Sequence, residues 1–380
     1  MAFIQPETHT VSTEHTEEST HNAKAIRVVD TDVHPEMPPL EQWIEFLEPA
    51  WHERVRRLGT EMPSVFWQNP HGVTRRDAYD EHGKSLAVCP LATKKEHLER
   101  YGIDRAILIP GNALNASCHP SPEQSMAIVR ATNRYFHERW LKPHTEYYGS
   151  IGVSTRDIAA SVEEIEYWAG EKKFVQIAMG GGQPMPLGER YFFPLYEAAA
   201  KLGLPIAIHP GQEGAGVSTT PTAAGWPSRY IEWHTCLSLS FQAHLVSLLC
   251  EGVFEKFPNL KIVLVEGGVA WLPTLMWRLD KNWKALRTEV PWVKKKPSEY
   301  LTDHLRITTQ PIEEPTDHQH LKQIFNMFDA ERMLMFASDF PHWDGDTPAF
   351  AVRGFSENFK QRVLGKNALE LYQLEKREAL

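Results

Sequence analysis

Acidic and imidazole side chains recur in this chain directly after short apolar stretches. The first stretch ends in Asp32 and His34, which lie two residues apart and would therefore leave the same face of a β-strand. A carboxylate beside an imidazole suits a divalent first-row metal ion. Asp-x-His arises by chance in many turns, so the weight of this pair depends on similar residues elsewhere in the chain.

Metal-ligand residue types also follow three later apolar stretches, 204–209, 261–266 and 333–338. Charged groups beside buried strands are costly to desolvate unless they are paired or bound to a metal. A zinc site with an open position needs fewer ligands than these stretches offer, and mixed carboxylates and imidazoles also suit iron or manganese. We therefore predict one or two divalent ions, zinc or iron and manganese. The six candidate ligands are Asp32, His34, His209, Glu266, Asp339 and His342.

Eight apolar stretches, most of them followed by a stretch of helical spacing, are expected to position these residues. Such alternation is typical of a parallel sheet covered by helices, and eight repeats indicate an α/β fold of the (β/α)8 TIM-barrel type, whose reactive residues lie at the carboxyl ends of the strands. A doubly wound open sheet is the alternative, but the first strand lacks its Gly-rich fingerprint. The predicted strands are 25–34, 105–110, 147–153, 174–179, 204–209, 261–266, 305–309 and 333–338; the predicted helices are 123–142, 158–168, 191–202, 235–257, 269–285, 318–328 and 357–374.

The chain divides into a tail and one large domain. Residues 1–24 are rich in Thr, Glu and His and are expected to be a flexible tail, whereas residues 25–380 are expected to form a single barrel. Residues 35–100 are too many for an ordinary connection between a strand and a helix. We interpret this long insertion as a cap over the active-site face; a structural insertion far from the chemistry is the alternative.

Composition excludes several classes of function. The 380 residues carry a formal net charge of -9, and no basic patch dominates, so nucleic acid is not an expected partner. No apolar run reaches the length of a membrane span, and the first 25 residues do not form a signal peptide. The four cysteines are widely spaced, which favours reduced thiols and a cytoplasmic location.

The motifs together resemble the amidohydrolase superfamily, in particular the branch that contains aminocarboxymuconate-semialdehyde decarboxylase. The resemblance covers about residues 25–372 and includes the segments 252–261 and 367–372. It implies that Asp339 both binds metal and shuttles protons, and that a homodimer is the usual assembly. It also implies a metal-dependent enzyme in which Asp32, His34, His209 and Asp339 are ligands.

Two positions depart from the family pattern. The fourth predicted strand offers Gln176 and no lysine, so the carbamylated-lysine bridge of some binuclear relatives is absent. The sixth ends in Glu266, where the decarboxylase branch has a catalytic histidine, which puts decarboxylation by the usual route in doubt. Glu266 then has three interpretations: a general base, a metal ligand that bridges two ions, or an acceptor for the amides of Gly267 and Gly268.

The expected activity is hydrolysis of a small amide, ester or lactone, in which the metal lowers the pKa of its bound water and polarises the carbonyl. Non-oxidative decarboxylation is a close variant. The alternative class is an oxygen-activating dinuclear iron or iron–manganese monooxygenase on the same fold, and a non-enzymatic partner subunit is a weaker one. Arg229 is a candidate to pair with a substrate carboxylate, or is an ordinary surface arginine. The candidate substrate-binding residues are His119, Arg229, His234 and Gln310.

Overall fold

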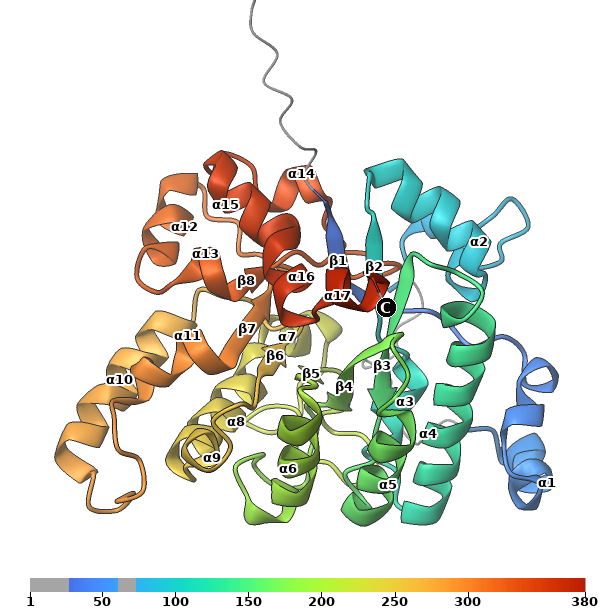
Figure 1. Ribbon diagram of the computed structural model, residues 1–380, viewed down its shortest axis with the longest axis horizontal. Coiled ribbons are helices and arrows are strands. Elements are labelled where there is room, and N and C mark those ends of the chain that lie inside the picture. Colours follow the sequence, from blue (N-terminus) through green and yellow to red (C-terminus); the bar gives the residue numbers. More distant parts are fainter. Residues whose placement is uncertain (1–26, 61–72, 380) are drawn as a thin grey trace, which may run out of the picture.

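The computed structural model describes residues 27–60 and 73–379 of the chain (Figure 1). The predicted tail, 1–24, lies outside the described residues, as does part of the insertion, 61–72. The described residues form one eight-stranded sheet in which consecutive strands are neighbours and every pair is parallel. The strands are β1 Val29–Val33, β2 Arg105–Leu108, β3 Tyr147–Gly152, β4 Phe174–Gly180, β5 Ile206–His209, β6 Ile262–Leu264, β7 Leu305–Thr308 and β8 Leu334–Met335.

The sheet closes where β1 meets the end of β8. Val33 and Phe340 form an isolated parallel bridge, and the backbone N–H of Thr31 donates to the carbonyl of Phe336 at 3.0 Å. The N–H of His34 likewise donates to the carbonyl of Phe340 at 2.8 Å. The predicted (β/α)8 barrel, with its long insertion after β1, is therefore confirmed.

Helices surround the barrel and connect the strands in sequence order (Figure 1). In the described part of the chain the insertion contains α1 Pro49–Leu58, α2 Pro90–Thr93 and a π-helical turn, Lys94–Glu99. The other principal helices are α3 Gly111–Ala116, α4 Pro122–Phe136, α5 Ile158–Trp168, α6 Phe193–Leu202, α8 Ser238–Cys250, α10 Leu272–Leu286, α12 His318–Phe325, α15 Glu357–Gln361 and α16 Asn367–Leu371. Shorter ones are α7 Tyr230–Thr235, α9 Val253–Lys256, α11 Leu301–His304, α13 Ala330–Met333, α14 Pro348–Ala351 and α17 Leu374–Ala379.

Two of the predicted helices are wrong in their continuity. The stretch 235–257 is divided among α7, α8 and α9: α7 ends at Thr235, and α8 begins at Ser238. Gly252, with a left-handed φ of 70°, separates α8 from α9. The stretch 357–374 is interrupted by a π-helical turn at Arg362–Lys366 and ends in a separate helix. By contrast, the predicted helix 191–202 ends where expected, and Gly203 follows α6 with a left-handed φ of 65° and ψ of 28°.

Side chains fill the barrel, so its interior is core and not a channel. Val29, Ile107, Val175 and Val263 are fully buried in one apolar cluster inside the sheet. Tyr372 belongs to the same cluster, and its hydroxyl donates to Oε1 of Gln176 at 2.8 Å. Open space for chemistry is therefore left at the carboxyl ends of the strands.

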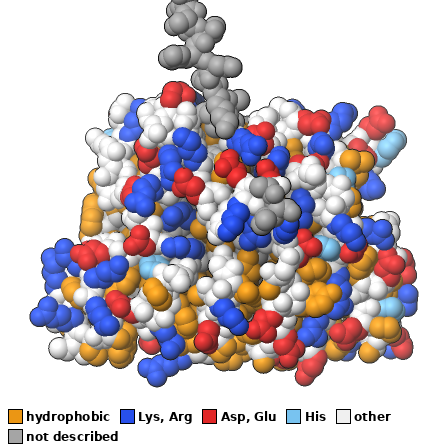
Figure 2. Space-filling model, in the orientation of Figure 1, with side chains coloured by type: hydrophobic (Ala, Val, Ile, Leu, Met, Phe, Trp, Pro, Cys, Tyr) orange, Lys and Arg blue, Asp and Glu red, His pale blue; other side chains and the backbone are white. Residues whose placement is uncertain are grey.

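Charged side chains of both signs occur on the surface. Figure 2 shows positive and negative side chains interspersed over this face of the molecule, without a continuous basic stripe. In the described part of the chain, no helix combines the length and the apolar character that a bilayer crossing requires.

Candidate metal centre

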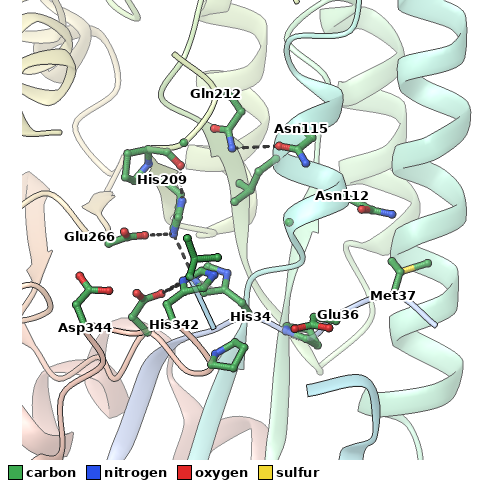
Figure 3. A pocket seen from close by; sticks show the side chains of 18 of the residues that line it. His34, Glu36, Met37, Asn112, Asn115, His209, Gln212, Glu266, His342 and Asp344 are labelled. Carbon is green, nitrogen blue, oxygen red and sulfur yellow. Dashed lines mark hydrogen bonds and ion pairs between the residues drawn. The ribbon is translucent and has the colours of Figure 1, made fainter. Parts of the chain in front are cut away.

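Six acidic and imidazole side chains meet at the carboxyl ends of β1, β5, β6 and β8 (Figure 3). Nε2 of His34 lies 3.0 Å from Oδ1 of Asp32 and 3.1 Å from Oδ1 of Asp339. Nε2 of His209 lies 3.2 Å from Nε2 of His34 and 2.9 Å from Oε2 of Glu266. The potential ligand atoms form two overlapping groups: Asp32, His34, His209 and Glu266, and His34, Glu266, Asp339 and His342, with the atoms of each group within 4.8 Å of one another.

Backbone carbonyls set the orientation of the two central imidazoles. Nδ1 of His34 lies 2.9 Å from the carbonyl oxygen of Ile109, and Nδ1 of His209 lies 2.6 Å from that of Pro210. A carbonyl oxygen can only accept, so each Nδ1 carries a proton, and in the neutral form of each ring Nε2 presents its lone pair to the centre. Such a bond fixes the tautomer and the ring orientation of a metal-binding histidine.

The carboxylate of Asp32 supplies a test of whether a cation fits. Asp32 is fully buried, and within the described chain neither of its oxygens accepts a hydrogen bond. A buried carboxylate without a partner is strongly disfavoured. Here its oxygen faces the lone pair of His34 at 3.0 Å, an arrangement that a shared divalent cation would stabilise. The donors therefore fit a metal ion.

Burial and neighbouring charges also shift the pKa values of the side chains in this centre. Although burial opposes it, the charges of Asp32 and Asp339 raise the pKa of His34 well above its usual range. Burial, with the charge of Asp339 next, raises the pKa of Glu266 well above that of an ordinary carboxyl group. Burial lowers the pKa of His209, which keeps the imidazole in its neutral, metal-binding form. The pKa values of carboxyl groups and of imidazoles at this site are thus shifted by burial and by the surrounding negative charge.

Two of the acidic residues have an unusual backbone conformation. Glu266 and Asp339 have φ values of 59° and 57°, in the left-handed region that residues other than glycine seldom adopt. Glu266 lies two residues after the end of β6, and Asp339 lies four residues after the end of β8. Such backbone persists where the surrounding structure requires it, and it concentrates at functional sites.

Asp339 is held from two sides. Nδ1 of His342 lies 2.6 Å from Oδ1 of Asp339, while Nε2 of Gln310 donates to Oδ2 at 3.3 Å. Although burial opposes it, the positive charge of His342 lowers the pKa of Asp339 below its usual range. Gln310 is fully buried behind the carboxylate, and we interpret it as a support for Asp339 and not as a substrate contact.

Glu266 directs its carboxylate into the site and away from the adjacent glycine turn. The amides that follow this turn belong instead to Glu313, whose carboxylate accepts the N–H of Val269 at 3.0 Å and that of Ala270 at 2.9 Å. The interpretation of Glu266 as the acceptor for this turn therefore has no support from the contacts. Its two chemical interpretations, general base and metal ligand, remain.

A cavity of about 310 Å³ opens in front of the six side chains. Figure 3 shows Asn115 and Gln212 on the wall across from His342, with Nε2 of Gln212 donating to Oδ1 of Asn115 at 3.5 Å. Among the described residues that line this cavity there is no lysine or arginine, whereas four carboxylates do line it. These acidic residues are Glu36, Glu266, Asp339 and Asp344, and apolar parts of the wall come from Met37, Val73, Leu114, Tyr230 and Trp233.

The predicted substrate-binding residues are dispersed. His234 lies at the edge of the site, with Nε2 3.3 Å from Oδ2 of Asp344 and 3.8 Å from Oε1 of Glu266. Arg229 is exposed at the start of α7 and outside the cavity lining, and its guanidinium donates to the carbonyl of its neighbour Ser228. His119 is buried beside Ser121, also outside the lining. Of the four residues, Gln310 and His234 contact the acidic side chains of the site, and His234 lines the neighbouring pocket and not this cavity.

Sequence reasoning missed several wall residues. Asn115 lies one helical turn after Asn112 on α3, and Gln212 follows β5 by three residues. Their place after a strand was a usable signal, but uncharged amides are common in turns and do not stand out. Glu36 and Met37 belong to the insertion, so at least its first residues lie at the active-site face, as the capping interpretation requires.

Comparison with known proteins identifies a matching family and similar proteins. Residues 121–374 match the protein family described as Amidohydrolase. Gamma-resorcylate decarboxylase of Polaromonas sp. is 24% identical over 290 residues, which cover 73% of this chain and 85% of that protein. The 2-amino-3-carboxymuconate-6-semialdehyde decarboxylase of Dictyostelium discoideum is 27% identical over 268 residues, or 67% of this chain and 68% of that protein.

A solved structure shares the fold over nearly the whole chain. It is 5-carboxyvanillate decarboxylase of Novosphingobium aromaticivorans, complexed with manganese and 4-hydroxy-3-methoxy-5-nitrobenzoic acid. The two chains are 20% identical with a TM-score of 0.69, and the match covers 95% of this chain and 100% of that chain. At this identity the likeness establishes the fold.

Proposed function

This chain belongs to the amidohydrolase family, and from that premise we propose that it is a metal-dependent hydrolase of a small, uncharged amide, ester or lactone. The predicted family resemblance is thereby confirmed, as is the expectation of an enzyme of this type. The choice of reaction is our inference from the walls of the cavity.

The charge of the cavity lining is the observation that carries the proposal. Two carboxylates, Asp32 and Asp339, suffice to balance one divalent ion, and Glu36 and Asp344 add further acidic groups to the cavity, whereas burial favours the protonated form of Glu266. Within the described lining no lysine or arginine is present to meet a substrate carboxylate. An anionic substrate would be repelled here, whereas an uncharged carbonyl compound would not.

Different residues of the chain would have different roles in such a hydrolysis. Asp32, His34, His209 and Asp339 would hold the metal, which when bound polarises a carbonyl group and makes a nucleophile of water at neutral pH. Glu266, with Oε2 directed at the centre, is the group that takes and returns a proton. Asn112, Asn115 and Gln212 offer uncharged donors and acceptors that would orient the substrate. Met37, Tyr230 and Trp233 would exclude bulk water.

Non-oxidative decarboxylation is the second candidate, because the relatives named above are decarboxylases of carboxylic acids. It requires that the metal or metals alone neutralise the substrate carboxylate, since the described lining provides no basic side chain of arginine or lysine type. The two overlapping ligand groups share His34 and Glu266 and have enough donors for two ions. A dinuclear centre would relieve the excess of negative charge, and it would also be the requirement for the oxygenase alternative.

One experiment separates the three reactions. The purified, metal-replete chain would be incubated with a matched set built on one aromatic skeleton: methyl ester, primary amide, lactone and free carboxylic acid. We expect the uncharged members to yield the free acid or hydroxy acid, and the activity to disappear in His209→Ala. Carbon dioxide release from the free acid, with the ester and the amide untouched, would overturn the proposal in favour of decarboxylation. Consumption of dissolved oxygen would overturn it in favour of the oxygenase.

A further inference from the structure

We infer that Asp30 and His97, neither of which is a candidate ligand, are positioning residues that hold the two halves of the metal centre in register. The ligands come from both sides of the seam at which the barrel closes: Asp32 lies in β1 and His34 directly follows it, whereas Asp339 and His342 follow β8. The inference rests on the metal centre of the proposed function but not on the reaction that takes place there.

The seam lacks a continuous strand ladder at the level of the ligands. Across the seam an isolated bridge joins Val33 of β1 to Phe340, which follows β8. Regular pairing of β8 with its other neighbour, β7, ends at Met335, and the pairing of β1 with its other neighbour, β2, has an irregular register between Asp30 and Val33. Beyond these points the described chain is held across the seam by single contacts, one of which joins the N–H of Asp339 to the carbonyl of Asp32 at 3.1 Å. Side chains must therefore replace part of the missing ladder.

Asp30 supplies that replacement. Its Oδ1 accepts the backbone N–H of Asp32 at 3.2 Å and the backbone N–H of Ser338 at 2.9 Å. One buried carboxylate oxygen thus joins the backbone of a ligand on the β1 side to the residue immediately before Asp339 on the β8 side. Asp30 itself is fully buried and belongs to neither of the two groups of potential ligand atoms.

His97 holds Asp30 in place from below the site. Its Nε2 lies 2.9 Å from Oδ2 of Asp30 and 3.1 Å from Oγ of Ser338, and that Oγ in turn accepts the N–H of Phe340 at 3.1 Å. The imidazole stacks on the ring of Phe340, with centroids 4.3 Å apart and planes 17° apart. His97 belongs to the π-helical turn at the end of the insertion, so this segment contacts the ligand loop after β8.

The contacts distinguish positioning from simple packing. Removal of the Asp30 carboxylate would leave two buried N–H groups without an acceptor, one in each half of the centre. Each half would relax independently, and the distances among the ligand atoms would change although the core is unaltered. Groups that orient metal ligands in this way typically contribute about 10- to 100-fold in metal affinity.

The test measures the dissociation constant for Mn²⁺ and for Zn²⁺ in the metal-free, folded chain, without any substrate. We expect Asp30→Ala to weaken binding by about 10- to 100-fold. Asp30→Asn retains an oxygen that accepts both N–H groups, and it should restore nearly normal affinity. His97→Phe retains the stacked ring but not the contact to Asp30, and it should weaken binding in the same direction, which provides a second variant if Asp30→Ala does not fold.

His304→Phe is the matched control. His304 is also a buried histidine that stacks on a phenylalanine, Phe254, at 4.5 Å and contacts a backbone carbonyl, that of Leu260, at 2.8 Å, but it lies far from the ligands in the topology, before β7. We expect this variant to lower the melting temperature and to leave both dissociation constants unchanged. The inference is overturned if Asp30→Ala or His97→Phe folds and binds both metals with wild-type affinity, or if His304→Phe weakens binding as much. Because no substrate is present, failure of the hydrolase proposal would not affect this result.

Discussion

Oε2 of Glu266 lies 2.9 Å from Nε2 of His209, and this contact joins the ends of β5 and β6 at the base of the cavity. Both side chains are buried, and the histidine is held by its other nitrogen on a backbone carbonyl. A neutral imidazole nitrogen and a carboxylate oxygen at this distance make a donor pair for a cation. The same contact leaves Oε1 of Glu266 free to face His234 and the substrate side.

Replacement of His209 tests the ligand set. We expect His209→Ala to lose most bound metal and nearly all activity while the barrel stays folded, because the side chain removed is one of the four potential ligands of the first group. Metal content per chain, measured by elemental analysis beside a circular dichroism spectrum, provides the check. His119→Ala, at a histidine outside the cavity lining, should retain its metal. Full occupancy in His209→Ala would show that the centre lies elsewhere.

Replacement of Glu266 separates proton transfer from metal binding. Glu266→Gln keeps the size of the side chain but cannot accept a proton, so a general base lost in this way should slow turnover by about 10²- to 10⁴-fold with normal metal content. If Glu266 bridges two ions, the variant should instead lose about one of them, since a neutral amide is a poor ligand for hard cations. Turnover and metal stoichiometry of the same sample decide between the two. Normal values of both would exclude each role.

The charge of the cavity predicts its preference for ligands. Asn115→Arg introduces a guanidinium into a lining that has none among the described residues, and it should strengthen binding of benzoate by about tenfold, as one charge-assisted contact does. Binding of uncharged benzamide should change little. Asn115→Gln controls for the longer side chain. Calorimetric titration of both ligands is the measurement, and tighter benzoate than benzamide binding in the wild type would contradict the charge argument.

Removal of the metal is expected to loosen the insertion. The N–H of Trp343 donates to the carbonyl of Val73 at 2.6 Å, and the N–H of Arg75 donates to the carbonyl of Pro341 at 2.8 Å. These bonds tie the insertion to the loop that carries His342, so loss of the ion from that loop should increase local opening. Treatment with a chelator should therefore speed limited proteolysis within 35–100, and added metal should reverse the effect. Equal cleavage rates would favour a remote structural insertion.

One buried histidine predicts a pH dependence of stability. His244 accepts the N–H of Leu187 through Nδ1 at 3.2 Å and donates through Nε2 to the carbonyl of Gly181 at 2.8 Å, so the fold requires its neutral form. Burial accordingly lowers the pKa of His244 below its ordinary value of 6.5. The unfolded chain then binds more protons than the folded chain, and the free energy of unfolding must fall as pH drops below 6.5 towards the lowered pKa.

The matched variant is His244→Gln, which offers an acceptor and a donor but does not titrate. We expect the melting temperature of the wild type to fall more steeply than that of this variant between about pH 7.5 and pH 5. Thermal unfolding followed by circular dichroism, with the metal removed from both proteins, isolates the contribution. Parallel curves for the two proteins would refute it.

The repeating elements and the convergence of the candidate ligands could be predicted from local pattern alone. Strand and helix periods are properties of neighbouring residues, and parallel strands must end at one rim, so Asp32, His209 and Asp339 had to converge once the barrel was inferred. Helix continuity was less predictable: the break at Gly252 depends on a backbone conformation that glycine permits but does not require.

Only the tertiary structure decided which of the remaining polar residues serve the site. Gln310 proved to stand behind Asp339, Arg229 lies at the surface, and Asp30 meets His97 from 67 positions away. These relationships depend on how long loops cross the mouth of the barrel, and no periodicity records such a path. The charge of the cavity is likewise a sum over side chains brought together from several strands and the insertion. A sequence specifies the partners of a residue along its own strand or helix by spacing, whereas contacts between distant loops arise only when the whole chain packs.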